Sequence, residues 1–215
     1  MRWSMVIDLQ RCTGCYSCMI SCKEEHFLPR DVFWNRVLIS QVGKFPAVTK
    51  EILPVLCNHC QEAPCLKVCP TNATTQRADG IVMVDYDKCM GCRNCVIACP
   101  YQNRTFLAEQ GELFKGWGYT PPEILGQRLY PLQTGTTVKC NFCVERIDEG
   151  LEKGLKPGVD REATPACVIA CPAKARYFGD LDDPQSEVSM LIRQKKGFQL
   201  HPEFGTDSSV YYLKY

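Results

Sequence analysis

Residues 89–100 read CMGCRNCVIACP, and this stretch decides how the chain folds. Its cysteines follow the spacing C-x2-C-x2-C-x3-C, with proline directly after the last one. A compact loop of this kind wraps three thiolates around three irons of one cubane cluster, while the cysteine three residues later lies on a short helix that points toward a neighbouring cluster. The motif therefore indicates paired iron–sulphur clusters that exchange their fourth ligands.

The same frame recurs along the chain and uses every cysteine. Residues 12–22 have the identical spacing, residues 57–69 follow C-x2-C-x4-C-x3-C, and residues 140–171 follow C-x2-C-x23-C-x3-C. Proline follows the last cysteine of each group except the first, where Lys23 comes next. The sixteen cysteines thus form four groups of four: Cys12, Cys15, Cys18 and Cys22; Cys57, Cys60, Cys65 and Cys69; Cys89, Cys92, Cys95 and Cys99; Cys140, Cys143, Cys167 and Cys171.

Disulfides or zinc sites could also account for a cysteine-rich chain, but both fit this pattern less well. Cysteines two residues apart in tight loops rarely reach the Cα separation and torsion that a disulfide needs. Zinc sites use paired C-x2-C units, but not a run of three cysteines followed by x3-Cys-Pro. Zinc is the better of the two alternatives, and colour distinguishes it from iron because zinc sites are colourless.

Short strands and helices are predicted next to the cysteine groups, which gives an α+β fold. Strands are expected at residues 5–9 and 80–86, leading into the first and third groups, and at residues 175–181 after the fourth. Short helices are expected at residues 16–25 and 92–98. The repeating unit is therefore strand, cluster loop, short helix and strand.

Residues 23–56 and 104–139 interrupt this repeat. The second stretch shows little helical periodicity and is rich in aromatic residues: Phe106, Phe114, Trp117, Tyr119 and Tyr130. Partner interfaces favour such residues, so the stretch is either a docking surface or a loop packed over a cluster. Long insertions without regular structure are often functional, which favours docking.

Charge and composition exclude several classes of function. The formal net charge is +1, and four oxidised sites of about −2 each would bring the loaded chain to about −7. No basic excess points to nucleic acid, and no apolar run reaches the roughly eighteen residues of a membrane span. The chain also lacks a G-x-G-x-x-G fingerprint and a phosphate loop, so nicotinamide and flavin are not expected.

The order of the groups, together with two long stretches, resembles one family closely. These are PTNATTQRADGIVMVDYDKCMGCRNCVIACPY at 70–101 and ACVIACPAKARYFGDLDDPQSEVSMLI at 166–192, and HPEFGTDSSVYYL at 201–213 is similar to the family's C-terminal strand. The chain is similar to the iron–sulphur subunits of the complex molybdoenzymes, which include dimethyl sulfoxide, polysulfide, thiosulfate, tetrathionate and arsenate reductases. The resemblance covers all but residues 104–139 and parts of 23–56.

The resemblance implies how the cysteines are shared among four 4Fe-4S clusters. In the family, groups one and four share two clusters, and groups two and three share the other two. Cys92 is present, whereas some relatives lack the cysteine at that place and hold a 3Fe-4S cluster. The implied ligand sets are Cys12, Cys15, Cys18 and Cys171; Cys22, Cys140, Cys143 and Cys167; Cys57, Cys60, Cys65 and Cys99; Cys69, Cys89, Cys92 and Cys95.

The family also implies two interleaved ferredoxin-like modules, each with two 4Fe-4S clusters, short strands, short helices and long loops. Residues 1–56 with 140–215 form the first module and its C-terminal extension, residues 57–103 form the second, and residues 104–139 are an inserted loop. The cysteine spacing supports ligand exchange within pairs, whereas the choice of which groups pair comes from the resemblance.

The function implied is a non-catalytic electron-transfer subunit of a heteromeric oxidoreductase in anaerobic respiration. Its partner would be a large subunit holding molybdenum or tungsten on a pterin cofactor, with a membrane quinone-binding subunit or a soluble carrier as second partner. The main alternatives are a free polyferredoxin and a self-contained enzyme with an open iron site, although no group lacks its fourth cysteine. The N-terminus shows no signal peptide. Because relatives without a signal of their own are often exported folded alongside a partner that carries one, we expect export with a partner to the periplasm or the outer face of the cell membrane, with the cytoplasm as alternative.

Several residues beside the cysteine groups invite a functional interpretation. His59 lies between two cysteines of a complete group, which favours a loop histidine over a metal ligand. Arg11, Lys88, Arg93 and Lys139 stand beside cysteines, where positive charge would raise a cluster's reduction potential. A solvated surface position is an equally good interpretation of each of these four side chains.

Overall fold

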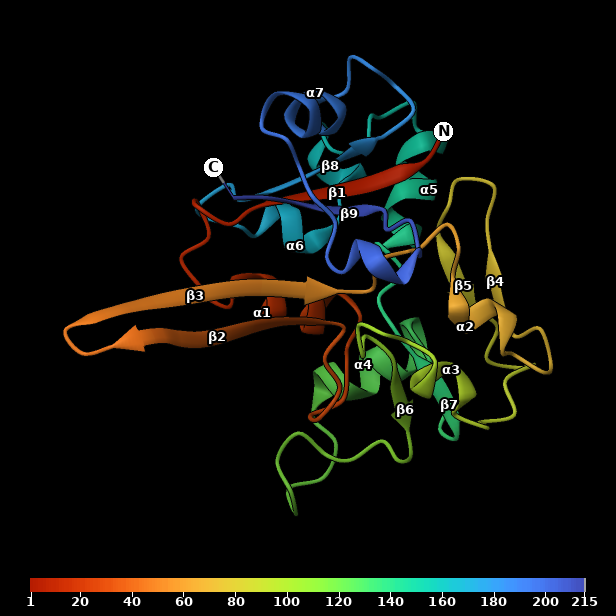
Figure 1. Cartoon of the computed structure of the whole chain (residues 1–215). Helices are drawn as coiled ribbons and strands as arrows, with labels where there is room; N and C mark the ends of the chain where they lie inside the picture. Colours follow the sequence, from red (N-terminus) through yellow and green to blue (C-terminus); the bar gives the residue numbers. More distant parts are fainter. Residues whose placement is uncertain (215) are drawn as a thin grey trace.

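The computed structural model describes residues 1–214, and it has the predicted α+β architecture of short elements joined by long loops (Figure 1). The strands are β1 (Trp3–Asp8), β2 (Asn35–Lys44), β3 (Ala47–Leu56), β4 (Thr74–Gln76), β5 (Val82–Val84), β6 (Thr105–Leu107), β7 (Thr136–Val138), β8 (Arg176–Asp180) and β9 (Val210–Leu213). The helices are α1 (Ser17–Glu25), α2 (Pro64–Lys67), α3 (Asn94–Ile97), α4 (Pro121–Leu129), α5 (Val144–Glu152), α6 (Ala166–Ile169) and α7 (Glu187–Gln194), with 3₁₀ turns η1 (Arg161–Ala163) and η2 (Pro202–Phe204).

One three-stranded sheet joins the two ends of the chain in the order β8-β1-β9. Strand β1 runs antiparallel to β8, with Met5 opposite Phe178, and parallel to β9, with Met5 also opposite Val210. Every residue of β1 is buried, because both faces of the sheet are covered. Val6 packs with Val188 of α7 on one face, while Met5 belongs to the main core on the other.

The elements predicted around the cysteine groups are present and differ from their predicted bounds only at the ends. Strands β1, β5 and β8 and helices α1 and α3 correspond to the five predicted segments. Both helices start after a residue with left-handed backbone, Tyr16 (φ 62°) before α1 and Arg93 (φ 63°) before α3. The two cysteine loops therefore enter their helices in the same way, as expected for a repeated unit.

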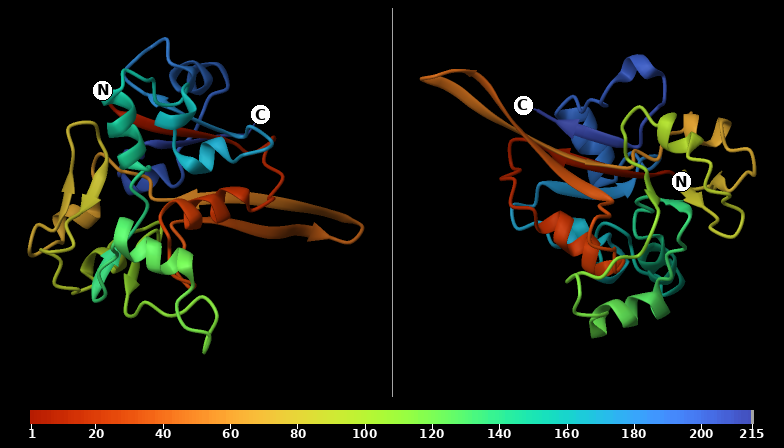
Figure 2. Two further views of the ribbon diagram at one scale, coloured as in Figure 1. Left: turned by 180° about the vertical axis from the view of Figure 1, so that it is seen from behind. Right: turned by 90° about the horizontal axis from the view of Figure 1, so that it is seen from below.

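Residues 35–56 form a long hairpin that the sequence analysis did not predict. Strands β2 and β3 pair antiparallel from Asn35 opposite Leu56 to Lys44 opposite Ala47. The hairpin projects from the body of the molecule, as two further views show (Figure 2). Its root is buried, whereas its tip is exposed, and the Phe45 side chain is 93% exposed. Only the root therefore contributes to the core.

The inserted stretch 104–139 has more regular structure than its sequence pattern predicted. Strands β6 and β7 pair, with Phe106 opposite Thr137. Helix α4 begins at a capping box, in which the Glu123 carboxylate accepts hydrogen bonds from the backbone N–H and the hydroxyl of Thr120. The helix is thus set by local capping rather than by an apolar face. The loop before it leaves Trp117 83% exposed.

Within residues 1–214, no helix combines the length and the apolar character that crossing a lipid bilayer requires.

Candidate metal centres

The first and fourth cysteine groups meet at a pocket beside β1, which we call site 1. Cys12, Cys15, Cys18 and Cys171 line it, together with Arg176. Burial raises the pKa of the Cys12 thiol, and the nearby thiolates of Cys18 and Cys171 raise it further. Gly14 has a φ of +69° in the loop that carries the first three cysteines, a conformation that glycine adopts without strain.

The remaining cysteines of these two groups form site 2 in the interior. Cys22 from α1 lies close to Cys140 and Cys167, and Cys143 lies close to all three. Burial raises the pKa of Cys143 well above its usual value, and the neighbouring thiolates raise it further. All four thiols are buried, so no water competes with them for a metal.

The second and third groups meet in the same reciprocal way. At site 3, Cys60 lies close to Cys57, Cys65 and Cys99, and burial followed by the charge of Cys57 raises the pKa of Cys60 to about 12. Site 4 is a pocket lined by the remaining four cysteines of these groups: Cys69, Cys89, Cys92 and Cys95. The structure therefore brings together every set of four that the family resemblance implies.

The four sites form a row. Burial raises the pKa of Cys167 of site 2, and Cys18 of site 1 is near enough to raise it further. Cys57 of site 3 acts in the same way on Cys140 of site 2, whose pKa burial and Cys57 raise to about 12. The Arg104 guanidinium links sites 3 and 4, because it interacts with Cys65 as well as with Cys95. The order along the row is therefore site 1, site 2, site 3 and site 4.

The donor sets fit 4Fe-4S clusters in their chemistry and spacing. Thiolate sulphur is the preferred ligand of iron–sulphur clusters and of zinc. A zinc ion draws its ligands to about 2.3 Å from one point, whereas a cube binds each thiolate at a separate iron. Within residues 1–214, no three His, Cys, Asp or Glu side chains converge closely enough to share a single ion. Each site instead offers four thiols, one for each iron of a cube.

Backbone N–H groups already point at the sulphur atoms. Thr74 donates to Cys69 at 3.5 Å, Phe142 donates to Cys140 at 3.5 Å, and Ala175 donates to Cys171 at 3.3 Å. Hydrogen bonds to thiolate sulphur stabilise its negative charge and are one of the levers that set a cluster's potential. The loops are therefore organised to hold anionic ligands.

Three buried cations provide a further test of fit. Arg176, Lys139 and Arg104 are only 4%, 3% and 5% exposed, respectively. Burial acts to lower the pKa of Arg104, but the thiolates of Cys65 and Cys57 more than offset this, so that its pKa is raised. A buried charge without a counter-charge is strongly destabilising. Anionic clusters at the sites supply the missing negative charge.

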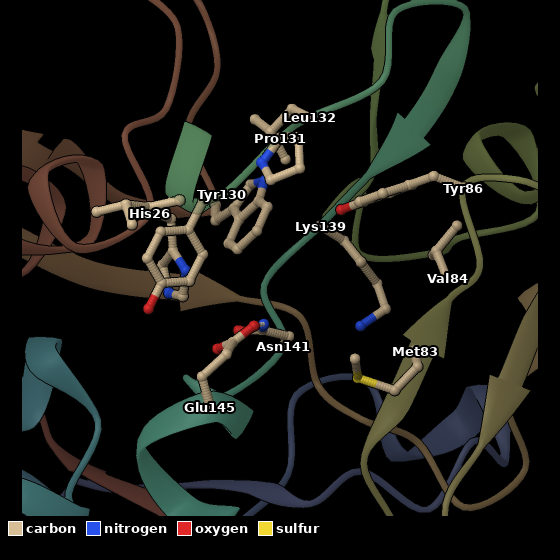
Figure 3. Close-up of a pocket in the computed structure, with 12 residues that line it drawn as sticks. His26, Met83, Val84, Tyr86, Tyr130, Pro131, Leu132, Lys139, Asn141 and Glu145 are labelled. Atoms are coloured by element: carbon tan, nitrogen blue, oxygen red, sulfur yellow. Dashed lines mark hydrogen bonds between the residues drawn. The ribbon is translucent and has the colours of Figure 1, made fainter. Parts of the chain in front are cut away.

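A cavity of about 280 Å³ opens beside site 2 (Figure 3). His26, Trp34, Tyr86 and Tyr130 are among the residues that line it. His26 Nε2 lies 3.3 Å from Cys143 Sγ. Burial, and then the charge of Arg146, lowers the pKa of His26 to about 4, so this imidazole is neutral at pH 7. It therefore adds a polar contact to site 2 without adding charge.

Among the histidine and the four cations singled out in the sequence, some side chains are buried and others are exposed. His59 is buried, accepts a hydrogen bond from the Val82 N–H at 3.0 Å and stacks on Phe142, so it is not exposed to solvent. Lys139 is also buried, which rules out the surface interpretation for that residue. The remaining three candidate cations are exposed: Arg11, Lys88 and Arg93.

Comparisons with known proteins agree with this geometry. Residues 48–120 match the model of the 4Fe-4S dicluster domain, and residues 9–25 match that of the 4Fe-4S binding domain. The arsenate respiratory reductase iron–sulphur subunit of Shewanella sp. is 39% identical over all of this chain and 97% of its own length. This chain belongs to the iron–sulphur subunits of the complex molybdoenzyme reductases. The prediction of 4Fe-4S clusters with an electron-transfer function is thereby confirmed.

Further relatives place the family in several reactions. A sulfite dehydrogenase subunit of Allochromatium vinosum is 39% identical over 98% of this chain and 82% of its own length. A tetrathionate reductase subunit of Salmonella typhimurium is 39% identical over 99% of this chain and 72% of its own length. The relatives thus include subunits of reductases as well as a subunit of a dehydrogenase.

The sequence analysis missed two of the three buried cations. Arg104 and Arg176 each follow the last cysteine of a group by five positions, in CPYQNRTF at 99–106 and CPAKARYF at 171–178. The shared pattern C-P-x3-R-x-F was a signal that could have found them. The repeat therefore carries a cation as well as ligands.

Proposed function

We propose that this chain conducts single electrons through four 4Fe-4S clusters, from an entrance at one end of the row to an exit at the other. The observation that carries the proposal is the exposure of the thiols. Of the sixteen cysteines, only Cys15 and Cys92 are exposed. Cys15 belongs to site 1 and Cys92 to site 4, the two ends of the row. The most exposed thiols therefore mark the two ends of the row as the places for electron entry and exit.

We assign the cluster ligands as the sets that surround the sites. Sites 1 and 2 belong to a first ferredoxin-like module of residues 1–56 and 140–215, and sites 3 and 4 to a second module of residues 57–103. The lining of the pockets at sites 1 and 4 and the mutual effect of the thiols at sites 2 and 3 support this assignment. The two cysteine groups of the first module flank those of the second, so the two modules are interleaved in sequence.

The chain itself performs no substrate chemistry in this proposal. A cluster accepts and releases one electron with little movement of its ligands. The protein's residues bury the thiols, orient backbone N–H groups toward sulphur and place cations between the sites. Every group has its four cysteines, which leaves no ligand position open for a substrate.

The two ends of the row require two redox partners. One is a large catalytic subunit with molybdenum or tungsten on a pterin cofactor, as the family implies. The second is a membrane quinone-binding subunit or a soluble carrier. The inserted residues 104–139 carry the exposed side chains Trp117, Phe114 and Tyr119, which suit a docking role.

Copurification and metal analysis test this function. The chain, produced under anaerobic conditions with its neighbouring subunits, should elute with a large subunit in gel filtration and contain about sixteen irons. A free polyferredoxin would elute alone with the same iron content. A chain that held zinc, or markedly less iron, would contradict the proposal.

For localisation, we propose export of the folded chain together with a partner. A partner subunit that carries an export signal would take the folded chain across the membrane with it. Cell fractionation should recover the complex at the outer face of the cell membrane or in the periplasm. Recovery of the assembled complex from the cytoplasm would overturn this proposal.

A further inference from the structure

Three buried cations lie along the row, and the ion pairs of residues 1–214 include none of them. They are Arg176, Lys139 and Arg104, each at most 5% exposed. Burying a charge away from water costs several kcal/mol unless a counter-charge lies near it. The described carboxylates do not pair with these cations. The cysteine thiols near them are therefore the candidates for the counter-charge.

Arg176 lies between sites 1 and 2. Its side chain lines the site 1 pocket together with Cys12 and Cys171. Its Nη1 approaches Cys167 Sγ of site 2 at 3.7 Å, and its Nη2 donates to Asn35 Oδ1 at 3.0 Å. The hydrogen bond to Asn35 fixes the guanidinium, so its charge faces both sites at once.

Arg104 occupies the equivalent place between sites 3 and 4. Its Nη2 donates to Cys65 Sγ of site 3 at 3.1 Å, and its Nη1 donates to Thr74 Oγ1 at 3.1 Å. The backbone N–H of Thr74 in turn donates to Cys69 Sγ of site 4. One guanidinium therefore connects the ligand shells of two neighbouring sites.

Lys139 lies between the two pairs. It directly precedes Cys140 of site 2, and its Nζ donates to the carbonyls of Cys140, at 2.7 Å, and of Val82. Its charge faces Cys57 and Cys65 of site 3 as well as Cys140. Figure 3 shows this side chain reaching from its strand end toward Met83. Each junction in the row thus holds one cation.

The origin of the cations matches this placement. Arg104 and Arg176 stand at the same position of the repeat, five residues after a Cys-Pro cysteine, and each lies within a cluster pair. Lys139 directly precedes the first cysteine of its group, as Arg11 and Lys88 do in theirs, but of these three only Lys139 is buried, and it lies where the pairs meet. The row therefore has one kind of junction inside each pair and another kind between the pairs.

We propose that Arg176, Lys139 and Arg104 are junction cations, each of which raises the reduction potentials of the two clusters beside it and offsets the repulsion between them. This inference rests on the proposed function. The reaction at each cluster is the gain of one electron from the neighbouring site, with no bond made or broken and no proton moved. A fixed positive charge favours that electron on either side, and it acts strongly because the interior screens charge weakly.

The test is a redox titration of the whole anaerobically purified complex, followed by electron paramagnetic resonance. Arg104→Gln and Arg176→Gln should each lower two of the four midpoint potentials, and the two pairs should share no member. Lys139→Gln should lower one member of each pair. At a fixed potential we expect about a tenfold lower ratio of reduced to oxidised cluster, equivalent to about 59 mV for one electron.

The controls separate charge from shape. Arg104→Lys keeps the charge and should retain the wild-type potentials, and Arg128→Gln removes an exposed arginine and should change none. If Arg104→Gln loses iron and Arg104→Lys does not, charge is what the junction requires. Equal loss of iron with Gln and Lys, unchanged potentials, or a shift of all four would overturn the proposal.

Iron content distinguishes failure of this inference from failure of the proposed function. A wild-type complex without about sixteen irons per chain would contradict the function itself. If the wild-type complex has the full iron content and none of the three substitutions changes a midpoint potential, only the proposal of the junction cations is contradicted.

Discussion

The two halves of the cluster row rest on very different amounts of apolar packing. Sites 1 and 2 adjoin the main core, which includes Met5, Phe142, Phe178 and Tyr212 around the three-stranded sheet. The core beside sites 3 and 4 has five buried members, and three of them are cysteines. Apolar burial can therefore stabilise the surroundings of sites 1 and 2 to a large extent, whereas we expect the surroundings of sites 3 and 4 to depend more on their clusters. Metal binding supplies folding free energy where the core is small.

The largest expected effect comes from removing iron. Anaerobic chelation should abolish hydrogen-exchange protection of β4 and β5, which border sites 3 and 4, before β1, β8 and β9 lose theirs. The reason is that β4 and β5 pair only with each other, over three residues, and the apolar core beside them is small. Hydrogen exchange detected by mass spectrometry measures this protection. Simultaneous loss in both regions would show that they depend equally on their clusters.

A core substitution probes the contact between the two halves. Phe142 is 1% exposed and stacks on His59, from the second module, with ring centroids 3.8 Å apart. Phe142→Ala should lower the free energy of unfolding by about 3–5 kcal/mol. Phe114→Ala, at a side chain that is 58% exposed, is the matched control and should stay within about 0.5 kcal/mol. Denaturant unfolding under anaerobic conditions measures the free energy of unfolding of both variants. Equal losses would show that the contact between Phe142 and His59 does not stabilise the protein.

A pH-dependent contribution to stability is expected from Asp8, in the first module. Burial acts to raise the pKa of Asp8, but the Lys195 ammonium at 2.9 Å and the N–H groups of Arg11 and Gln10 lower it overall. Because the folded pKa is depressed, this stabilisation is present above the unfolded value of about 3.9 and is lost as pH falls through the folded value.

Asp8→Asn should therefore cost about 1–3 kcal/mol at pH 7, and the difference from wild type should narrow below about pH 4. The unfolding of both proteins can be measured by rapid mixing into buffers of several pH values, before acid can act on the clusters. A difference that stays constant with pH would mean that the Asp8 charge is not what matters.

The smallest effect is expected at the surface of α5. Lys153 and Glu149 form an ion pair at 2.6 Å, but both side chains are more than half exposed. Exposed pairs of this kind contribute little, because water and salt screen them. Lys153→Ala should leave both unfolding and cluster content unchanged in the same assays. A measurable loss would show that α5 supports site 2 through this pair.

The cysteine pattern was sufficient to predict the local units of the fold. Ligand spacing indicates the loops, the apolar segments that lead into two of them indicate β1 and β5, and the place after Cys-Pro indicates β8. The ligand sets required the family resemblance, because spacing alone does not say which distant groups meet. Only the folded chain shows which thiols lie side by side.

Several features depend on contacts that no local pattern reveals. The parallel pairing of β9 with β1 joins residues about 200 positions apart. Helix α4 was missed because Thr120 and Glu123 define its start while its sides carry no regular apolar stripe. Arg104 and Arg176 share the pattern C-P-x3-R-x-F, but only their tertiary position beside the thiols shows the role of that arginine.

The sheet order also has a consequence for how the chain is made. Strand β1 precedes the other described elements, yet both of its neighbours, β8 and β9, lie beyond residue 175. On the ribosome it must wait without partners until those strands have been made, whereas residues 57–99 emerge as one continuous stretch with all their cysteines. Maturation is therefore expected to begin in the middle of the chain and to finish with the joining of its two ends.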